Sequence, residues 1–568
     1  MGSQGSDWVT LASAKRNAIL EQVPNKWKIS GSVPSPKELP DVTGKVIQQY
    51  LSPHEIEITE TNAIGIVEKT RSGQWTSVEV TKAFCHRAAI AHQLVNCLHE
   101  TFFDAAIETA QELDAYLATH KKPIGALHGL PVSLKDQFHV KGVETTMGYV
   151  GWIGTFEGIK DDPRRKTFES ELVRELRALG AVLFCKTSVP TTLMTTETVN
   201  NIIDYTWNPQ NRLLSSGGSS GGEAALIALK GSPGGFGTDI GGSVRIPASY
   251  NGLWALRPSG RLPYEGVATS IDGQNTVLSV VGPLSSSIGG ITLLFKSILS
   301  QHPWHHDPSV PEMPWRESIV EETLRLIAES KSTARGGLAF GVLRHDNIVH
   351  PTPPVSRALD SVIEVLRKEG HEIIEWKPPS HQLGAEILME ALTVDGGADV
   401  RFHLGLSGEP QPEQIAVNRP PGKQKTVLEV AAINIAKRNY QKAYLEYWNS
   451  TKQLTSRGRP IDAVICPVTA HSAVVPNKSR SMEYTLVPSL LDYTAVVMPV
   501  TEVKSQVDFA PDELSRAYLS EADKLTQHEY DPEVSNGSPV GVQLIGRRFE
   551  EEKILTLAEY VHAQLKGR

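Results

Sequence analysis

The sequence predicts an α/β protein built on a large, twisted, mixed β-sheet with helices on both faces. Short apolar runs bounded by glycine or proline alternate with helical patterns along most of the 568 residues, as in proteins whose strands are connected by helices. Hydrophobic residues make up 40% of the chain and charged residues 21%, a balance that supports a sizeable core. No run of about 18 apolar residues occurs, so we expect no membrane-spanning segment.

Residues 1–60 are expected to form a helical lead-in to a single domain over 61–568. Residues 12–23 are amphipathic, and prolines then interrupt the pattern. Farther on, Thr76 and Glu79 have the spacing of a capping box, in which each side chain binds the backbone N–H of the other residue. A helix is therefore predicted to follow Thr76.

The alternation of strands and helices begins near residue 125. Residues 130–134 form a short apolar run that ends at Lys135. Residues 170–180 place leucines on one helical face, and Gly180 is a typical helix stop. Residues 181–185 are continuously apolar, which predicts a strand buried on both faces.

The second half of the chain repeats this alternation. Residues 355–368 have the period of a helix that ends near Gly370. The strands expected here are 338–343, 372–376, 463–466, 495–498 and 540–545.

Variable loops are expected near 300–425. Residues 301–320 and 405–425 are rich in proline, glycine and polar side chains, and a helical stretch over 426–454 follows. These loops are longer than ordinary connections. They either line a pocket or decorate the surface.

Composition limits the partners and the compartment. The net charge is −8, with mixed signs and no Lys/Arg block, so nucleic acid is not an expected partner. The four cysteines have no C-x-x-C spacing, which fits small buried side chains in a reducing, cytoplasmic compartment. The N-terminus does not resemble a secretory signal. It matches a myristoylation pattern at Gly2, although a polar tip is the simpler interpretation.

One histidine-rich segment could suggest a metal site. It contains His302, His305, His306 and Asp307 in a proline-bearing loop, without further ligands nearby in the sequence. We therefore interpret it as surface, and no metal or cofactor is expected.

Two glycine-rich segments between 208 and 247 each present serine among glycines. They are Ser215-Ser-Gly-Gly-Ser-Ser-Gly-Gly-Glu223 and Gly237-Thr-Asp-Ile-Gly-Gly-Ser-Val-Arg-Ile-Pro247. Glycine lets successive backbone N–H groups converge on one anion. A serine in such a loop can attack a carbonyl while these amides hold the oxyanion, provided that a base activates it.

Two interpretations of these segments fit poorly. A phosphate-binding loop requires a lysine after the glycines, and none is present. Gly217-x-Ser219-x-Gly221 matches the nucleophile elbow of α/β-hydrolases, but residues 208–215 before it are polar and contain a proline, so no strand is expected there. The histidine of a Ser-His-Asp esterase also has no distinctive setting in this sequence.

The third interpretation is a family resemblance. Both segments, together with Gly129-Leu-Pro-Val-Ser-Leu-Lys-Asp136 and Pro539-Val-Gly-Val-Gln-Leu-Ile-Gly546, resemble the amidase signature family. The likeness runs from about residue 60 to 560, and residues 8–27 are similar to the start of fungal acetamidases. It implies the amidase signature fold and allows a homodimer.

The resemblance also implies a Ser–cis-Ser–Lys triad. Ser243 would be the nucleophile, Ser219 the bridging serine and Lys135 the base. The backbone N–H groups of the oxyanion hole would belong to Ile240, Gly241, Gly242 and Ser243. Substrate-binding positions would be Leu193, Gly217, Gly218, Ser219 and Thr238, with Thr187 also near the pocket. Supporting residues would be Ser220, Asp239 and Arg245.

The chemistry of these residue types is consistent with such roles. A lysine must be desolvated to act as a base at neutral pH, and Lys135 follows an apolar strand. The expected reaction cleaves a small-molecule carboxylic amide to an acid plus ammonia or an amine, through an acyl-enzyme. The alternatives are an amidotransferase subunit acting on aminoacyl-tRNA, an acyl-transferring biosynthetic enzyme, a Ser-His-Asp esterase, and a scaffold without catalysis.

Overall fold

The computed structural model describes residues 7–332, 337–415, 421–511 and 517–567. Gly2 and its myristoylation pattern lie outside them. The described part centres on one sheet of eleven strands. In sheet order they are β1 (Leu98–Thr101), β3 (Val182–Thr187), β2 (Pro131–Lys135), β8 (Gly234–Asp239), β10 (Val280–Ser285), β9 (Trp254–Arg257), β14 (Ala495–Glu502), β15 (Pro539–Ile545), β13 (Ala463–Pro467), β11 (Ala339–Val342) and β12 (Glu372–Glu375).

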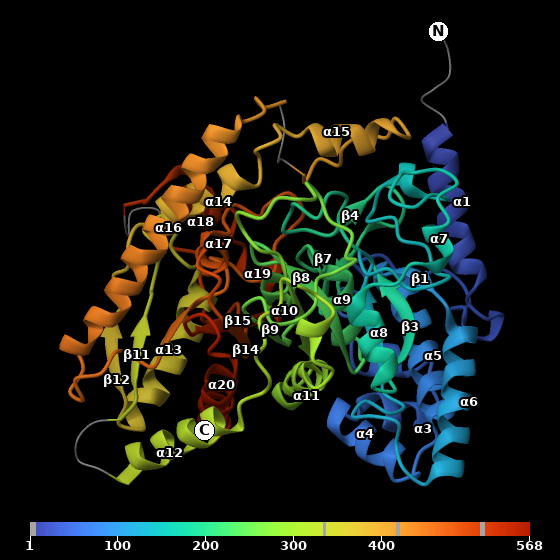
Figure 1. Ribbon diagram of the computed structural model, residues 1–568, viewed down its shortest axis with the longest axis horizontal. Coiled ribbons are helices and arrows are strands. Elements are labelled where there is room, and N and C mark those ends of the chain that lie inside the picture. Colours follow the sequence, from blue (N-terminus) through green and yellow to red (C-terminus); the bar gives the residue numbers. More distant parts are fainter. Residues whose placement is uncertain (1–6, 333–336, 416–420, 512–516, 568) are drawn as a thin grey trace.

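The sheet is mixed, as predicted. β2 is parallel to β3 and β8, and β11 is parallel to β12 and β13. The other neighbours are antiparallel. Figure 1 shows the β1–β3 end and the β11–β12 end on opposite sides of the molecule.

Helices cover both faces of the sheet, and the alternation along β14 demonstrates this. Val496 and Met498 lie in the large core, and α13 (Pro353–Lys368) and α20 (Glu551–Lys566) contact this strand. Val497, between them, belongs to a separate cluster with residues of α10 (Arg245–Tyr250). Successive side chains of a strand point to opposite faces, so both faces of β14 are covered.

The remaining helices flank this framework. The longer ones are α4 (Ala63–Arg71), α5 (Ser77–Val95), α6 (Phe103–His120), α8 (Glu171–Ala178), α9 (Gly221–Ala228), α11 (Ile288–Leu299), α12 (Glu317–Ser332), α14 (His381–Ala391), α15 (Ala398–Gly405), α16 (Val427–Ser450), α17 (Glu483–Leu490) and α18 (Glu521–Glu529). α5 begins at the predicted capping box. No described helix combines the length and the apolar character needed to cross a membrane.

The lead-in packs closely on the rest of the protein. Its first helix, α1 (Asp7–Glu21), buries Ala12 and Ile19 against Ile202 and its neighbours. Lys15 of α1 also forms ion pairs with Glu100 and Glu144. Apolar packing and buried charge pairing therefore both attach α1 to the sheet domain.

The segment before the serine-rich loop differs from expectation. We predicted no strand over 208–215, yet β7 (Asn211–Ser215) forms there and pairs with β6 (Trp207–Asn208). These two strands make a separate ribbon outside the central sheet. The prediction was wrong about the local conformation, because a cross-strand partner stabilised a sequence without apolar alternation.

Candidate active site

Neighbouring strands and two helix starts bring the predicted triad together. Lys135 is the last residue of β2, and Thr238 lies near the end of the parallel neighbour β8. Ser219 follows a cis peptide bond after Gly218 and precedes α9. Ser243 lies in the loop between β8 and α10. The carboxyl ends of two strands and two loops thus meet at one edge of the sheet.

Lys135 is fully buried and contacts two hydroxyl groups. Its Nζ lies 2.7 Å from Ser219 Oγ and 2.9 Å from Thr238 Oγ1. Burial lowers the pKa of Lys135 to about 7, although Asp239 and Glu223 act in the opposite direction. Neutral amine is therefore well populated near neutral pH.

The two serine-bearing segments contact each other directly. The backbone N–H of Ser220 donates to the carbonyl oxygen of Ser243 at 3.0 Å. The side chain of Ser220 is buried and makes no hydrogen bond within the described part of the chain, either as a donor or as a cap of α9. Ser220 therefore connects the two segments through its backbone N–H and not through its hydroxyl group.

Asp239 organises the loop that carries Ser243. Its carboxylate accepts hydrogen bonds from the backbone N–H groups of Gly242 and Val244 and from the Arg245 guanidinium, at 2.7–3.2 Å. Burial would raise the pKa of Asp239, but Arg245, together with Arg257 and the Gly242 N–H, outweighs burial and lowers the pKa to about 2. Asp239 and Arg245 therefore hold the loop.

The backbone N–H groups of this loop are potential hydrogen-bond donors. Gly242 has a φ of +127°, and a Cβ there would collide with Thr485. Its N–H already binds Asp239, whereas the N–H groups of Ile240, Gly241 and Ser243 have no hydrogen-bond acceptor among the described residues. Three of the four predicted oxyanion donors are therefore available in this structure.

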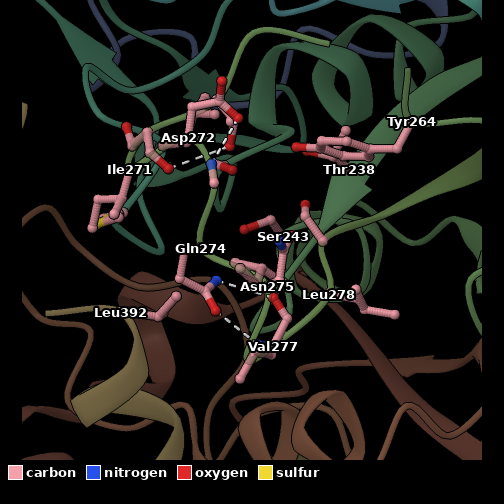
Figure 2. A pocket seen from close by; sticks show the side chains of 18 of the residues that line it. Thr238, Ser243, Tyr264, Ile271, Asp272, Gln274, Asn275, Val277, Leu278 and Leu392 are labelled. Carbon is pink, nitrogen blue, oxygen red and sulfur yellow. Dashed lines mark hydrogen bonds between the residues drawn. The ribbon is translucent and has the colours of Figure 1, made fainter. Parts of the chain in front are cut away.

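A cavity of about 190 Å³ opens beside these groups. Ser219, Thr238 and Ser243 line it together with Leu193. Figure 2 shows Ser243 between Tyr264 on one side and Gln274 and Leu392 on the other. Further lining residues are Met194, Ile240, Ser270, Asn275, Val277 and Leu278. No histidine among the described residues lines this cavity, which disfavours a Ser-His-Asp esterase here.

Some predicted binding residues lie elsewhere. Gly217 packs on Pro247, and Gly218 packs on the backbone of 195–197, so neither lines the cavity. Thr187 also lies outside it and donates instead to Glu223 Oε2 at 2.8 Å. Close backbone packing explains why glycine is needed at 217 and 218, in place of the substrate contact that we expected.

The structure also bears on two further predictions, the variable loops near 300–425 and the histidine-rich segment. Of region 300–425, Ser309 and Leu392 reach the cavity. His302, His305 and His306 are exposed. Asp307, however, is buried and accepts N–H bonds from Tyr264 and Glu265, so the surface interpretation was wrong for Asp307. No group of three or more His, Cys, Asp or Glu side chains within the described ranges could hold a metal. All four cysteines are buried and form no disulfide bond.

Sequence reasoning missed most of the cavity wall. Residues 269–279 and Tyr264 lie between β9 and β10, and they carry no recognisable motif. Gln137, which hydrogen-bonds Thr238 at 2.5 Å, was also overlooked. Its proximity to Lys135 in the chain was the one signal available.

Known proteins similar to this chain indicate its family. The family model described as Amidase matches residues 79–555. An acetamidase of Aspergillus oryzae is 44% identical over 98% of both chains, and an acetamidase of Emericella nidulans is 45% identical over 98% of this chain and 97% of its own.

Solved structures lead to the same family. A fatty acid amide hydrolase superposes with a TM-score of 0.88 at 31% identity, covering 99% of this chain and 96% of that one. The likeness therefore extends over the whole architecture as well as the glycine-rich motifs. This chain belongs to the amidase signature family and is an amidase.

Proposed function

We propose that this amidase hydrolyses a small carboxylic amide to the acid and ammonia or an amine, through an acyl-enzyme on Ser243. One observation carries the proposal: Lys135 Nζ lies 2.7 Å from Ser219 Oγ, both side chains are fully buried, and Ser219 and Ser243 line one cavity. A base (Lys135), a bridging hydroxyl (Ser219) and a nucleophile (Ser243) are thus available for a proton relay.

The proposed reaction transfers protons along this series. Neutral Lys135 takes the proton of Ser219 as Ser219 takes that of Ser243, whose oxygen bonds to the substrate carbonyl carbon. The relay then returns a proton to the amide nitrogen as the C–N bond breaks, because an amide anion is a poor leaving group. Water, activated by the same relay, cleaves the acyl ester and regenerates Ser243.

The oxyanion of each tetrahedral intermediate would be held by backbone N–H groups. Those of Ile240, Gly241 and Ser243 are free to donate, while Gly242 donates to Asp239. Donors fixed before the reaction stabilise developing charge without reorganisation. We therefore narrow the expected oxyanion hole to these three residues.

The cavity favours short amides. Its volume of about 190 Å³ and its wall of hydroxyl, amide and small apolar groups suit a compact substrate better than a long acyl chain. The relatives named acetamidase support the same substrate class. The four unbonded thiols are consistent with a reducing, cytoplasmic location.

Fluorophosphonate labelling tests the assignment. Mass spectrometry of the labelled protein should find one adduct, on Ser243, and acetamide or a related short amide should protect it. The Ser243→Ala protein should neither label nor hydrolyse amides. An adduct on Ser219 would overturn the assignment and favour the nucleophile-elbow interpretation.

A further inference from the structure

Gln137 lies two residues beyond Lys135 and is fully buried. Its Oε1 lies 2.5 Å from Thr238 Oγ1, which in turn lies 2.9 Å from Lys135 Nζ. Its Nε2 lies 2.8 Å from the carbonyl oxygen of Ala268. The backbone carbonyl of Gln137 also accepts the N–H of Ala268 at 3.0 Å. Gln137 is thus held on two sides at a fixed distance from the lysine.

These contacts determine the direction of each hydrogen bond. The carbonyl of Ala268 can only accept, so the NH₂ group of Gln137 must face it and Oε1 must face Thr238. Because Oε1 can also only accept, the single hydroxyl proton of Thr238 is donated to Gln137. Thr238 Oγ1 is then left to accept a hydrogen bond from Lys135.

The consequence concerns the lone pair of Lys135. A neutral amine has two N–H donors and one lone pair, and one donor is directed to Thr238. The lone pair is therefore available to the hydroxyl of Ser219, 2.7 Å away. If Thr238 were free to rotate its proton toward Lys135, it would compete for the same lone pair and block proton transfer from Ser219.

We infer that Gln137 is a positioning residue, which holds the Thr238 hydroxyl as an acceptor so that Lys135 keeps its lone pair for Ser219. This inference rests on the proposed relay. Gln137 acts through Thr238, and the charged groups that act on the pKa of Lys135 are Asp239 and Glu223, which both raise it.

Two variants separate orientation from charge. Gln137→Met keeps the length of the side chain and removes the acceptor. Its kcat for a short amide should fall about ten- to a hundredfold, with little change in KM. This decrease is smaller than the rate enhancement that a positioned general base provides in full. This loss should persist at high pH, because the misdirected Thr238 proton is not titrated. Gln137→Glu keeps an acceptor but adds charge that favours protonated Lys135, so its loss should be confined to lower pH and recover as the pH rises.

A double-mutant cycle provides the sharper test. Thr238→Val removes the hydroxyl through which Gln137 is proposed to act, so adding Gln137→Met to it should cost no further activity. Gln93→Met is the matched control, since Gln93 binds the backbone of Trp27 and Ile29 far from the cavity and its loss should leave kcat unchanged. Melting temperatures of all variants check folding.

The outcomes distinguish this inference from the proposed function. If Lys135→Ala hydrolyses amides normally, both fail. If Lys135→Ala is inactive while Gln137→Met has normal turnover, only the role of Gln137 fails. The role of Gln137 would also be overturned if Gln137→Met lowered kcat as much in the Thr238→Val background as in wild type. A kcat of Gln137→Met that recovers at high pH would overturn it as well.

Discussion

Lys135 Nζ and Ser219 Oγ lie 2.7 Å apart, although 84 positions separate them in the chain. Lys135 reaches this point from the end of β2, and Ser219 from the loop before α9. Both side chains are fully buried, so their contact is held by the packing around it. Four predictions concern this contact and the loop beside it.

The first prediction concerns the leaving group. Lys135→Ala should slow hydrolysis of a short amide by orders of magnitude, because the variant has no base for attack and no acid for the departing nitrogen. Activated aryl esters need no protonation of the leaving group and should lose much less. Steady-state rates for an amide and an ester with the same acyl group measure this; equal losses for both would contradict it.

The second prediction is an acid limb in the pH profile. Burial lowers the pKa of Lys135 to about 7, so the amine is neutral above that pH and protonated below it. The kcat/KM for an amide should therefore fall about tenfold per unit as the pH drops below the pKa. Initial rates at low substrate concentration measure it. An activity that stays constant well below neutral pH would exclude Lys135 as the base.

The third prediction concerns stability. The pKa of Lys135 is lowered on folding from 10.5 to about 7, so unfolding takes up a proton between these values and the native protein gains stability as the pH rises across this range. Lys135→Met should therefore be inactive yet more stable, by on the order of a few kcal/mol at neutral pH. The difference in melting temperature from wild type should shrink toward pH 10.5. A difference independent of pH would contradict this origin.

The fourth prediction concerns the buried pair Asp239 and Arg245. Arg245→Met leaves the carboxylate without its counter-ion and should cost about 3–5 kcal/mol, together with most of the activity. Adding Asp239→Asn should recover part of the stability. The exposed pair Arg325 and Glu329 is the control, since Arg325→Met should cost less than about 1 kcal/mol. Denaturant titration measures each change, and equal losses for both arginines would refute the prediction.

The sequence predicted the strands that form apolar runs, and it missed β1, β8, β9 and β10. Apolar runs correctly indicated strands such as β3 and β13. β8, in the interior of the sheet, has the sequence Gly-Gly-Phe-Gly-Thr-Asp and no apolar alternation. A Cβ at Gly235 would collide with Glu223 and Ser133, and one at Gly237 with Ser220. Packing against distant residues, which local periodicity does not contain, selected these glycines.

The site was predicted where motifs carry it. Ser219, Ser243 and Lys135 fall in segments that resemble family motifs, and the structure brings them to one edge of the sheet. The orientation of the Gln137 side chain and the position of Tyr264 in the cavity wall depend on contacts with residues about 100 or more positions away. Such contacts become visible only once the chain has folded.

The origin of the cavity wall also affects how this enzyme can diversify. Residues 269–279 lie in an irregular connection between β9 and β10, whereas Lys135 belongs to a strand in the interior of the sheet. Libraries restricted to 269–279 can therefore vary the shape of the pocket while the reactive groups keep their framework. Laboratory evolution, like natural divergence, can alter the range of substrates here without rebuilding the chemistry.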